Sequence, residues 1–135
     1  MGLSETLANY FDVHKNGSSV GTEIIAGITT FLTMSYIVVV NPAIMTGIPD
    51  AKPGIIISGF APGQVQSMLA VVTILAAAIA TLVMAFYANR PFAQAPGLGL
   101  NAFFAFTVIG ALGVSWLTAL AAIFVEGLLF NALTA

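Results

Sequence analysis

The sequence predicts an all-α polytopic membrane protein with four membrane-crossing segments. Of its 135 residues 59% are hydrophobic and 6% are charged, whereas roughly a quarter of the residues of a soluble domain are charged. Uncharged runs cover residues 24–49, 53–89 and 91–125, and each is long enough to cross a hydrocarbon core of about 30 Å. Backbone in lipid must satisfy its own hydrogen bonds, so we expect these runs to be mainly helical.

Charge and residue content exclude several classes of function. The formal net charge of −2 comes from three basic and five acidic side chains, which provide no basic stripe for nucleic acid. The chain has no cysteine, and its single histidine, His14, lies in a polar N-terminal segment. We therefore expect no metal site, no cofactor and no nucleic-acid partner. The first twenty residues are mixed and polar, so we also expect no cleaved targeting peptide.

Residues 1–23 form the N-terminal segment, which is expected to be cytoplasmic. Leu3, Leu7, Tyr10 and Phe11 recur at helical spacing, which indicates an amphipathic helix at the membrane surface. A frayed tail is the alternative. The remainder, residues 24–135, is expected to hold transmembrane segments one to four.

The first segment begins with an uncharged helix predicted over Ile24–Val40. We expect Pro42 either to kink this helix or to begin a new one capped by Asn41. Residues 41–66 contain four prolines and four glycines. That composition predicts a long loop with room for a hairpin.

The second and fourth segments are the simplest. Residues 67–88 form an uninterrupted apolar span with alanines at 76–78 and 80, which allow a neighbouring helix to approach closely. Residues 115–135 form another span, with Glu126 in its interior. Both are predicted to be complete transmembrane helices.

The third segment is broken. Residues 92–100, "FAQAPGLGL", contain one proline and two glycines and are expected to be extended, whereas residues 101 to about 112 form a half helix of roughly 18 Å. Irregular backbone survives at membrane depth only inside protein or beside a cavity. A half helix that starts near the midplane offers free N–H groups and a positive dipole end, as in many secondary transporters. The break is the predicted binding site.

Residues 97–102 also match the G-x-G-x-x-A dinucleotide fingerprint. No apolar strand precedes the match, and a chain this apolar cannot form the βαβ unit that the fingerprint requires. We therefore reject a nucleotide site.

Glu126 is expected to lie at the depth of Asn101. Both are equally far along the chain from a turn predicted at Gly113-Val114, about 19 Å of helix rise, which brings them near the midplane. A carboxylate at that depth should face the protein interior, paired or protonated. It then either couples proton movement or stabilises the core by a hydrogen bond.

Two motifs resemble those of a known family. "GTEIIAGITTFLTMSYIVVVNPAIM" (residues 21–45) and "QAPGLGLNAFFAFTV" (residues 94–108), followed by Glu126-Gly127, closely resemble the start of the AzgA-like purine permeases. These belong to the xanthine/uracil permease family, or nucleobase cation symporter family 2. The resemblance implies a fold of seven plus seven segments in inverted repeats, with segment 3 a short extended strand plus a half helix. This chain would then be segments 1–4, part of the substrate-binding core domain and the N-terminal fragment of a larger permease.

The resemblance also implies a function. It is secondary active transport of purine nucleobases (hypoxanthine, guanine and adenine), with proton symport as the expected coupling, sodium left open, and a homodimer as a candidate assembly of the full-length protein. The expected location is the cell membrane with the N-terminus cytoplasmic. With Lys15 and Arg90 inside and Lys52 outside, that orientation agrees with the positive-inside rule.

The predicted site combines the broken segment with the resemblance. Asn101 stands where the extended stretch is expected to become helical, its amide can both donate to and accept from a purine edge, and the corresponding asparagine of the resembled family lies at the binding site. A helix cap is the alternative role. The predicted substrate-binding residues are Asn101, Gly99, Ala102, Phe104 and Thr33, and Glu126 is predicted to be proton-coupling or core-stabilising.

Structural roles compete for several of these residues. Phe103, Phe104 and Phe106 are packing residues by default, although one of them can stack on a planar base. The hydroxyl groups of the first helix are expected to bond to carbonyl groups of their own helix or to a neighbouring helix. They belong to Thr29, Thr30, Thr33 and Ser35.

Two other classes of function were weighed. An intramembrane enzyme needs a catalytic pair at membrane depth, and Glu126 is the only ionisable residue expected there. A small structural or assembly subunit of a membrane complex is the stronger alternative, because four spans can form a chain and the alanine-rich second helix suits packing. A packing subunit, however, has no need of a broken segment.

Overall fold

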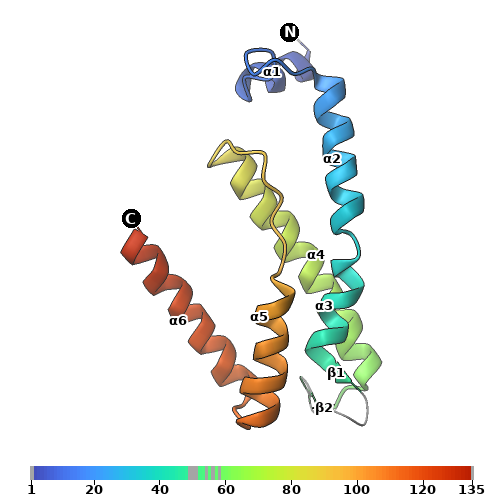
Figure 1. Cartoon of the computed structure of the whole chain (residues 1–135), viewed down its shortest axis with the longest axis vertical. Helices are drawn as coiled ribbons and strands as arrows, with labels where there is room; N and C mark the ends of the chain where they lie inside the picture. The colour runs from blue at the N-terminus through green and yellow to red at the C-terminus, as the bar shows by residue number, and fades with distance from the viewer. Residues whose placement is uncertain (1, 49–51, 54, 56, 58, 135) are drawn as a thin grey trace. The chain divides into compact units, whose positions relative to one another are not determined.

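The chain is mainly helical in the part described by the computed structural model, which is residues 2–48, 52–53, 55, 57 and 59–134. Three helical stretches are long and apolar enough to cross a membrane, Val20–Thr46, Pro62–Phe86 and Trp116–Thr134. Leu98–Ala111 is a shorter apolar helix (Figure 1). The prediction of a helical membrane protein whose third segment contains only a half-length helix is therefore confirmed.

The described residues form two compact units. The first contains Met1–Ile37 and Ala76–Ala95, and the second contains Val38–Leu75 and Pro96–Ala135. Helix α4 (Pro62–Phe86) contributes its first half to the second unit and its second half to the first. The other elements are α1 (Leu3–Tyr10), α2 (Val20–Met34), α3 (Ile37–Thr46), β1 (Gly47–Ile48), β2 (Lys52–Pro53), α5 (Leu98–Ala102), η1 (Phe103–Ala111) and α6 (Trp116–Thr134).

In the first unit, α1 is attached to the C-terminal end of α4 by aromatic residues. Tyr10 Oη donates a hydrogen bond to the carbonyl oxygen of Phe86 at 2.8 Å. The ring centroids of Tyr10 and Phe11 lie 6.5 Å and 5.8 Å from that of Phe86. The predicted N-terminal helix therefore exists. Helix α2 follows it and is capped by Ser19 Oγ, which accepts from the N–H of Thr22 at 3.3 Å.

The first segment is interrupted at a different place from the one predicted. The helix breaks at Ser35 and Tyr36, and Asn41 and Pro42 lie inside α3. Asn41 does not cap a new helix, so that alternative is wrong, whereas a kink caused by Pro42 stays a prediction. The carbonyl group that the Pro42 ring crowds belongs to Val38, which lies inside α3 and not at the break. The Ser35 hydroxyl donates to the carbonyl oxygen of Leu32 at 2.9 Å, and such bonds bend helices.

The predicted loop is shorter than expected because helices enter it from both ends. Helix α3 continues to Thr46, and α4 begins at Pro62, where a proline at the first helical position loses no hydrogen bond. Between them, β1 and β2 pair antiparallel with Gly47 opposite Pro53. The expected hairpin is confirmed, although residues 49–51 and parts of the following run lie outside the described residues.

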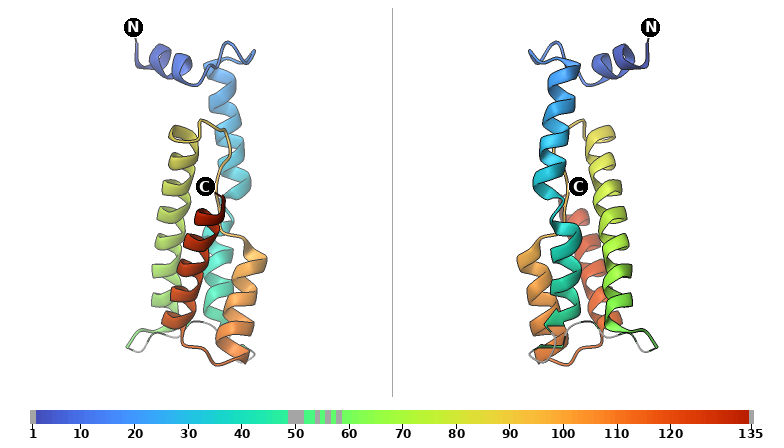
Figure 2. Two further views of the ribbon diagram at one scale, coloured as in Figure 1. Left: turned by 90° about the vertical axis from the view of Figure 1, so that its left-hand side faces the viewer. Right: turned by 90° about the vertical axis from the view of Figure 1, so that its right-hand side faces the viewer.

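The second unit surrounds a small apolar core. Figures 1 and 2 show α3, the first half of α4 and α5 with η1 running alongside one another. The buried side chains at the centre are Ile55, Val65, Phe104 and Ala119. Burying such side chains against each other is what holds these helices together in this unit.

The half helix differs from a regular α-helix. After α5, residues Phe103–Ala111 form a π-helix, a rare conformation that is associated with functional sites. Nothing in the sequence predicts it. The turn that follows is where we expected it, because Gly113 has a positive φ of 68° and α6 begins at Trp116.

Candidate functional site

The irregular stretch of the third segment is held against α4 by a side chain. Residues 89–97 form neither helix nor strand and run back along α4 (Figure 1). Thr81 Oγ1 accepts from the N–H of Gln94 at 2.9 Å and donates to the carbonyl oxygen of Gln94 at 3.4 Å. Non-helical backbone at membrane depth needs this kind of partner. The extended backbone reaches Gly97, with φ −77° and ψ 104°, but the strand itself stays a prediction.

The half helix begins three residues before the predicted junction. Gly97 is its N-cap residue, and α5 starts at Leu98. The N–H of Asn101 already donates to the carbonyl oxygen of Gly97 at 3.0 Å. The prediction that Asn101 marks the start of the helix, and its alternative role as a cap, are therefore wrong. The N–H groups that precede this first helical bond belong to Leu98, Gly99 and Leu100.

The Asn101 side chain belongs to a polar chain that links three helices of the second unit. Its Nδ2 donates to Oδ1 of Asn41 on α3. Asn41 Nδ2 in turn donates to Oγ1 of Thr73 on α4 at 2.9 Å. Asn41 is 7% exposed and Thr73 is 5% exposed. Two buried polar residues therefore hold Asn101, which the sequence predicts to bind substrate.

Sequence reasoning missed the roles of Asn41 and Thr73. It assigned Asn41 to a helix cap and did not consider Thr73. The available signal was an amide and a hydroxyl inside otherwise apolar spans, because polar side chains there usually bond across helices.

Two smaller predicted residues lie next to Asn101. Gly99 is exposed at the second position of α5, and a Cβ added to it would have no atom within 4 Å. Ala102 is half-buried. Both stand at the N-terminal end of the half helix, so they share the predicted location, and their contact with a substrate stays a prediction.

Phe104 is part of the apolar core. It is 6% exposed and packs with Ile55, Val65 and Ala119, which agrees with the packing role given as the default. Its neighbour Phe103 is 58% exposed. Stacking of an aromatic ring on a substrate stays a prediction.

Thr33 lies in the first unit, on α2. Its Oγ1 donates to the carbonyl oxygen of Thr30 at 2.8 Å. Thr29, Thr30 and Ser35 also donate to carbonyl groups of their own helix. The expected back-bonding is confirmed for all four hydroxyl groups. A role for Thr33 toward a substrate stays a prediction.

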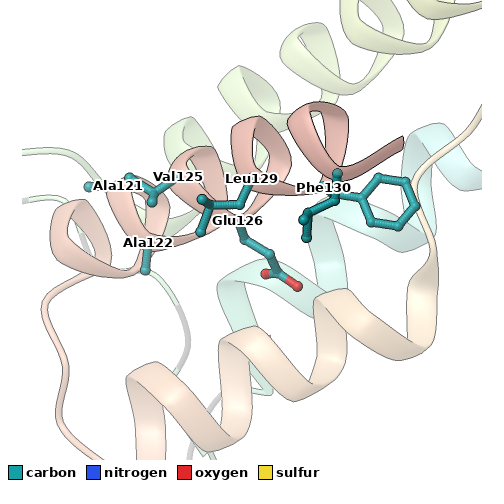
Figure 3. Close-up of a pocket in the computed structure, with 7 residues that line it drawn as sticks. Ala121, Ala122, Val125, Glu126, Leu129 and Phe130 are labelled. Atoms are coloured by element: carbon teal, nitrogen blue, oxygen red, sulfur yellow. The ribbon is translucent and has the colours of Figure 1, made fainter. Parts of the chain in front are cut away.

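Glu126 stands on the exposed side of α6 in an apolar setting. Figure 3 shows its carboxylate pointing away from α6 beside Ala122 and Phe130, in a shallow pocket that α6 alone lines. Within the described residues it has neither an ion pair nor a hydrogen bond. Its interior position and its depth relative to Asn101 stay predictions. In the same described part, no three His, Cys, Asp or Glu side chains gather as a metal site requires.

The chain as a whole is similar to known permeases. The model of the permease family that covers xanthine and uracil permeases matches residues 21–135. The chain belongs to the xanthine/uracil permease family. No solved structure matches it.

Relatives in this permease family carry purine names. The chain is 46% identical to the adenine permease AdeQ of Escherichia coli over 90% of its length, and 43% identical to the guanine/hypoxanthine permease PbuO of Bacillus subtilis over 89%. It spans about a quarter of these relatives, 24% of AdeQ and 25% of PbuO. The resemblance to the xanthine/uracil permeases is therefore confirmed, and together with the three membrane-length helices it indicates a multi-pass membrane protein.

Proposed function

We propose that the full-length permease containing this chain carries purine nucleobases across the cell membrane by secondary active transport. The observation that supports this most strongly is the 43–46% identity to permeases named for adenine and for guanine/hypoxanthine, which runs through nearly all of the chain. A structural subunit is not favoured, because such a subunit has no need of a broken third segment.

The proposed binding site is the start of the half helix. Asn101 contacts the base through its amide, and Gly99 and Ala102 let the base approach the backbone near the first N–H groups of α5. Free N–H groups at a helix start and an amide suit a planar ligand that both donates and accepts hydrogen bonds. Phe104 and Thr33 are also proposed contacts, although Phe104 is buried in the core and the Thr33 hydroxyl bonds to its own helix.

The proposed coupling is proton symport, with Glu126 as the proton-binding group or as a stabiliser of the core. An intramembrane carboxylate is costly to expose to lipid and is usually functional. Because this chain spans about a quarter of its relatives, other parts of the permease are proposed to cover the α6 face on which Glu126 stands.

The proposed architecture follows the resemblance. The chain is taken as segments 1–4 of two inverted repeats of seven, with a cytoplasmic N-terminus and a homodimer as the candidate assembly. Tyr10 and Phe86 contact each other in the first unit, which brings the N-terminal segment and the loop at Arg90 to the same end of α4. This agrees with Lys15 and Arg90 on one side of the membrane.

The substrate class is tested by competition. Uptake of labelled hypoxanthine is measured in cells that lack their own purine permeases and express the full-length protein, with each unlabelled base added in turn. We expect guanine and adenine to compete and uracil and xanthine to compete poorly. Strong competition by uracil but not by adenine would reject the assignment to the AzgA-like branch.

A further inference from the structure

Hydrogen-bond direction is determined along the polar chain of the second unit. Thr73 Oγ1 lies 2.7 Å from the carbonyl oxygen of Leu69, one turn earlier in α4. A carbonyl oxygen can only accept, and a hydroxyl group has one hydrogen, so Thr73 donates to Leu69. Toward Asn41, Thr73 can then only accept.

The direction of the hydrogen bond at Thr73 also determines how the amides of Asn41 and Asn101 are oriented. Asn41 must turn its NH2 group toward Thr73, at 2.9 Å, and therefore its Oδ1 toward Asn101. Asn101 must in turn offer its own NH2 group to Asn41. A reversed amide at Asn101 would bring two carbonyl oxygens together in a place where Asn41 is 7% exposed, which is unfavourable at low dielectric.

We propose that Thr73 and Asn41 are positioning residues that hold the Asn101 amide in one orientation, with its Oδ1 left to accept a hydrogen bond from a ring N–H of the ligand. This inference rests on the proposed function and adds the direction of recognition to it. A ligand that offers only an acceptor at that edge would face Oδ1 with no hydrogen between them. The preference for a ligand N–H therefore depends on the carbonyl group of Leu69, which lies in α4, a helix that is not proposed to contact the ligand.

The test compares Thr73→Val with Thr73→Ser in the full-length permease. Valine has nearly the shape of threonine but no hydroxyl, so Asn41 is free to turn and the orientation of Asn101 is lost. Serine keeps the hydroxyl and is the matched control. Uptake is expressed per copy of permease in the membrane. Inhibition of labelled hypoxanthine uptake is measured with hypoxanthine analogues in which one ring nitrogen is replaced by C–H.

We expect one analogue that has lost an N–H to bind the unchanged permease roughly tenfold more weakly than hypoxanthine does. A tenfold difference corresponds to about 1.4 kcal/mol. We expect the unchanged permease to tolerate an analogue in which C–H replaces one of the two ring nitrogens that carry no hydrogen. Thr73→Val should reduce the tenfold discrimination to about threefold or less, and Thr73→Ser should preserve it. If Thr73→Val does not reach the membrane, Asn41→Ser serves instead, because a hydroxyl that can both donate and accept imposes no direction on Asn101.

Two results would overturn the proposal. One is that every analogue lacking an N–H binds the unchanged permease as well as hypoxanthine does. The other is that Thr73→Val or Asn41→Ser discriminates against these analogues as strongly as the unchanged permease does. Both results are informative only if the permease without substitutions takes up hypoxanthine. A permease that takes up no purine at all would instead overturn the proposed function, and with it the ligand assigned to Asn101, so the two failures can be told apart.

Discussion

Asn101 is held by one backbone hydrogen bond and one side-chain hydrogen bond. Its backbone N–H makes the first hydrogen bond of the half helix, to Gly97, and its side chain bonds to Asn41. The backbone bond survives any substitution except proline, whereas the side-chain bond does not. Variants of Asn101 therefore report on its amide and not on the start of the helix.

We predict that Asn101→Ser weakens purine uptake through affinity. Serine is too short to reach both Asn41 and a ligand, and a ligand group left without its hydrogen-bond partner in the site costs about 1–3 kcal/mol, which corresponds to a roughly 5- to 150-fold rise in the apparent KM. The measurement is initial uptake against hypoxanthine concentration. A lower unfolding temperature with an unchanged KM would show that Asn101 only holds Asn41.

Glu126 gives a second prediction at this scale. Glu126→Gln keeps the shape of the side chain and its ability to form hydrogen bonds but cannot bind and release a proton. We expect accumulation against a gradient to be lost while exchange of labelled for unlabelled purine persists. Full pH-dependent accumulation by Glu126→Gln would reduce Glu126 to a structural residue.

At the scale of elements, the third segment combines irregular backbone with a half helix. The irregular part is held by Thr81, and the helical part by the apolar core and by Asn41. The two parts are thus anchored to different neighbours. Such an arrangement leaves the start of α5 uncovered, as the exposure of Gly99 indicates.

Gly99→Ala tests whether a ligand comes close to this helix start. The added Cβ meets no atom within 4 Å and alanine favours helix, so folding should be preserved. We predict that the apparent KM for hypoxanthine rises roughly tenfold, because the methyl group occupies space that the base requires. Gly63→Ala is the matched control, since Gly63 is also the second residue of a helix and also has open space around it. Equal KM values for both variants and the unchanged permease would remove Gly99 from the site.

At the scale of the whole molecule, the chain supplies two units joined by α4. Its outward faces are strongly apolar, with Phe31, Leu75 and Leu129 all more than half exposed. In a membrane protein such faces meet lipid or other protein segments.

The orientation of the chain can be tested with single cysteines, because the chain has none of its own. In a cysteine-free full-length permease, we predict that Ser18→Cys and Ala88→Cys react with a membrane-impermeant thiol reagent only after the cells are opened. Ala61→Cys should react in intact cells. The reason is the proposed placement of Lys15 and Arg90 in the cytoplasm. The opposite labelling pattern would invert the topology.

Much of the fold was accessible from the sequence, because in lipid the length of an apolar run and the need to satisfy backbone hydrogen bonds leave little freedom. The full helices, the half-length third helix, the hairpin and the turn at Gly113 were all predicted. The break at Ser35-Tyr36 was not, because no proline or glycine marks that place in the sequence. The π-helix had no signal in the sequence.

The site divides in the same way. The sequence by itself determined that Asn101 lies in an apolar, broken segment, where a polar amide indicates a functional role. It could do so because composition and the positions of glycine and proline are local properties. Only the tertiary structure decided that Asn101 is inside the helix and bonded to Asn41, and that Thr73 completes the chain. Asn41 and Asn101 are 60 residues apart in the chain, and Asn41 and Thr73 are 32 residues apart. Pairing over such distances depends on which helix faces meet, and no single segment contains that information.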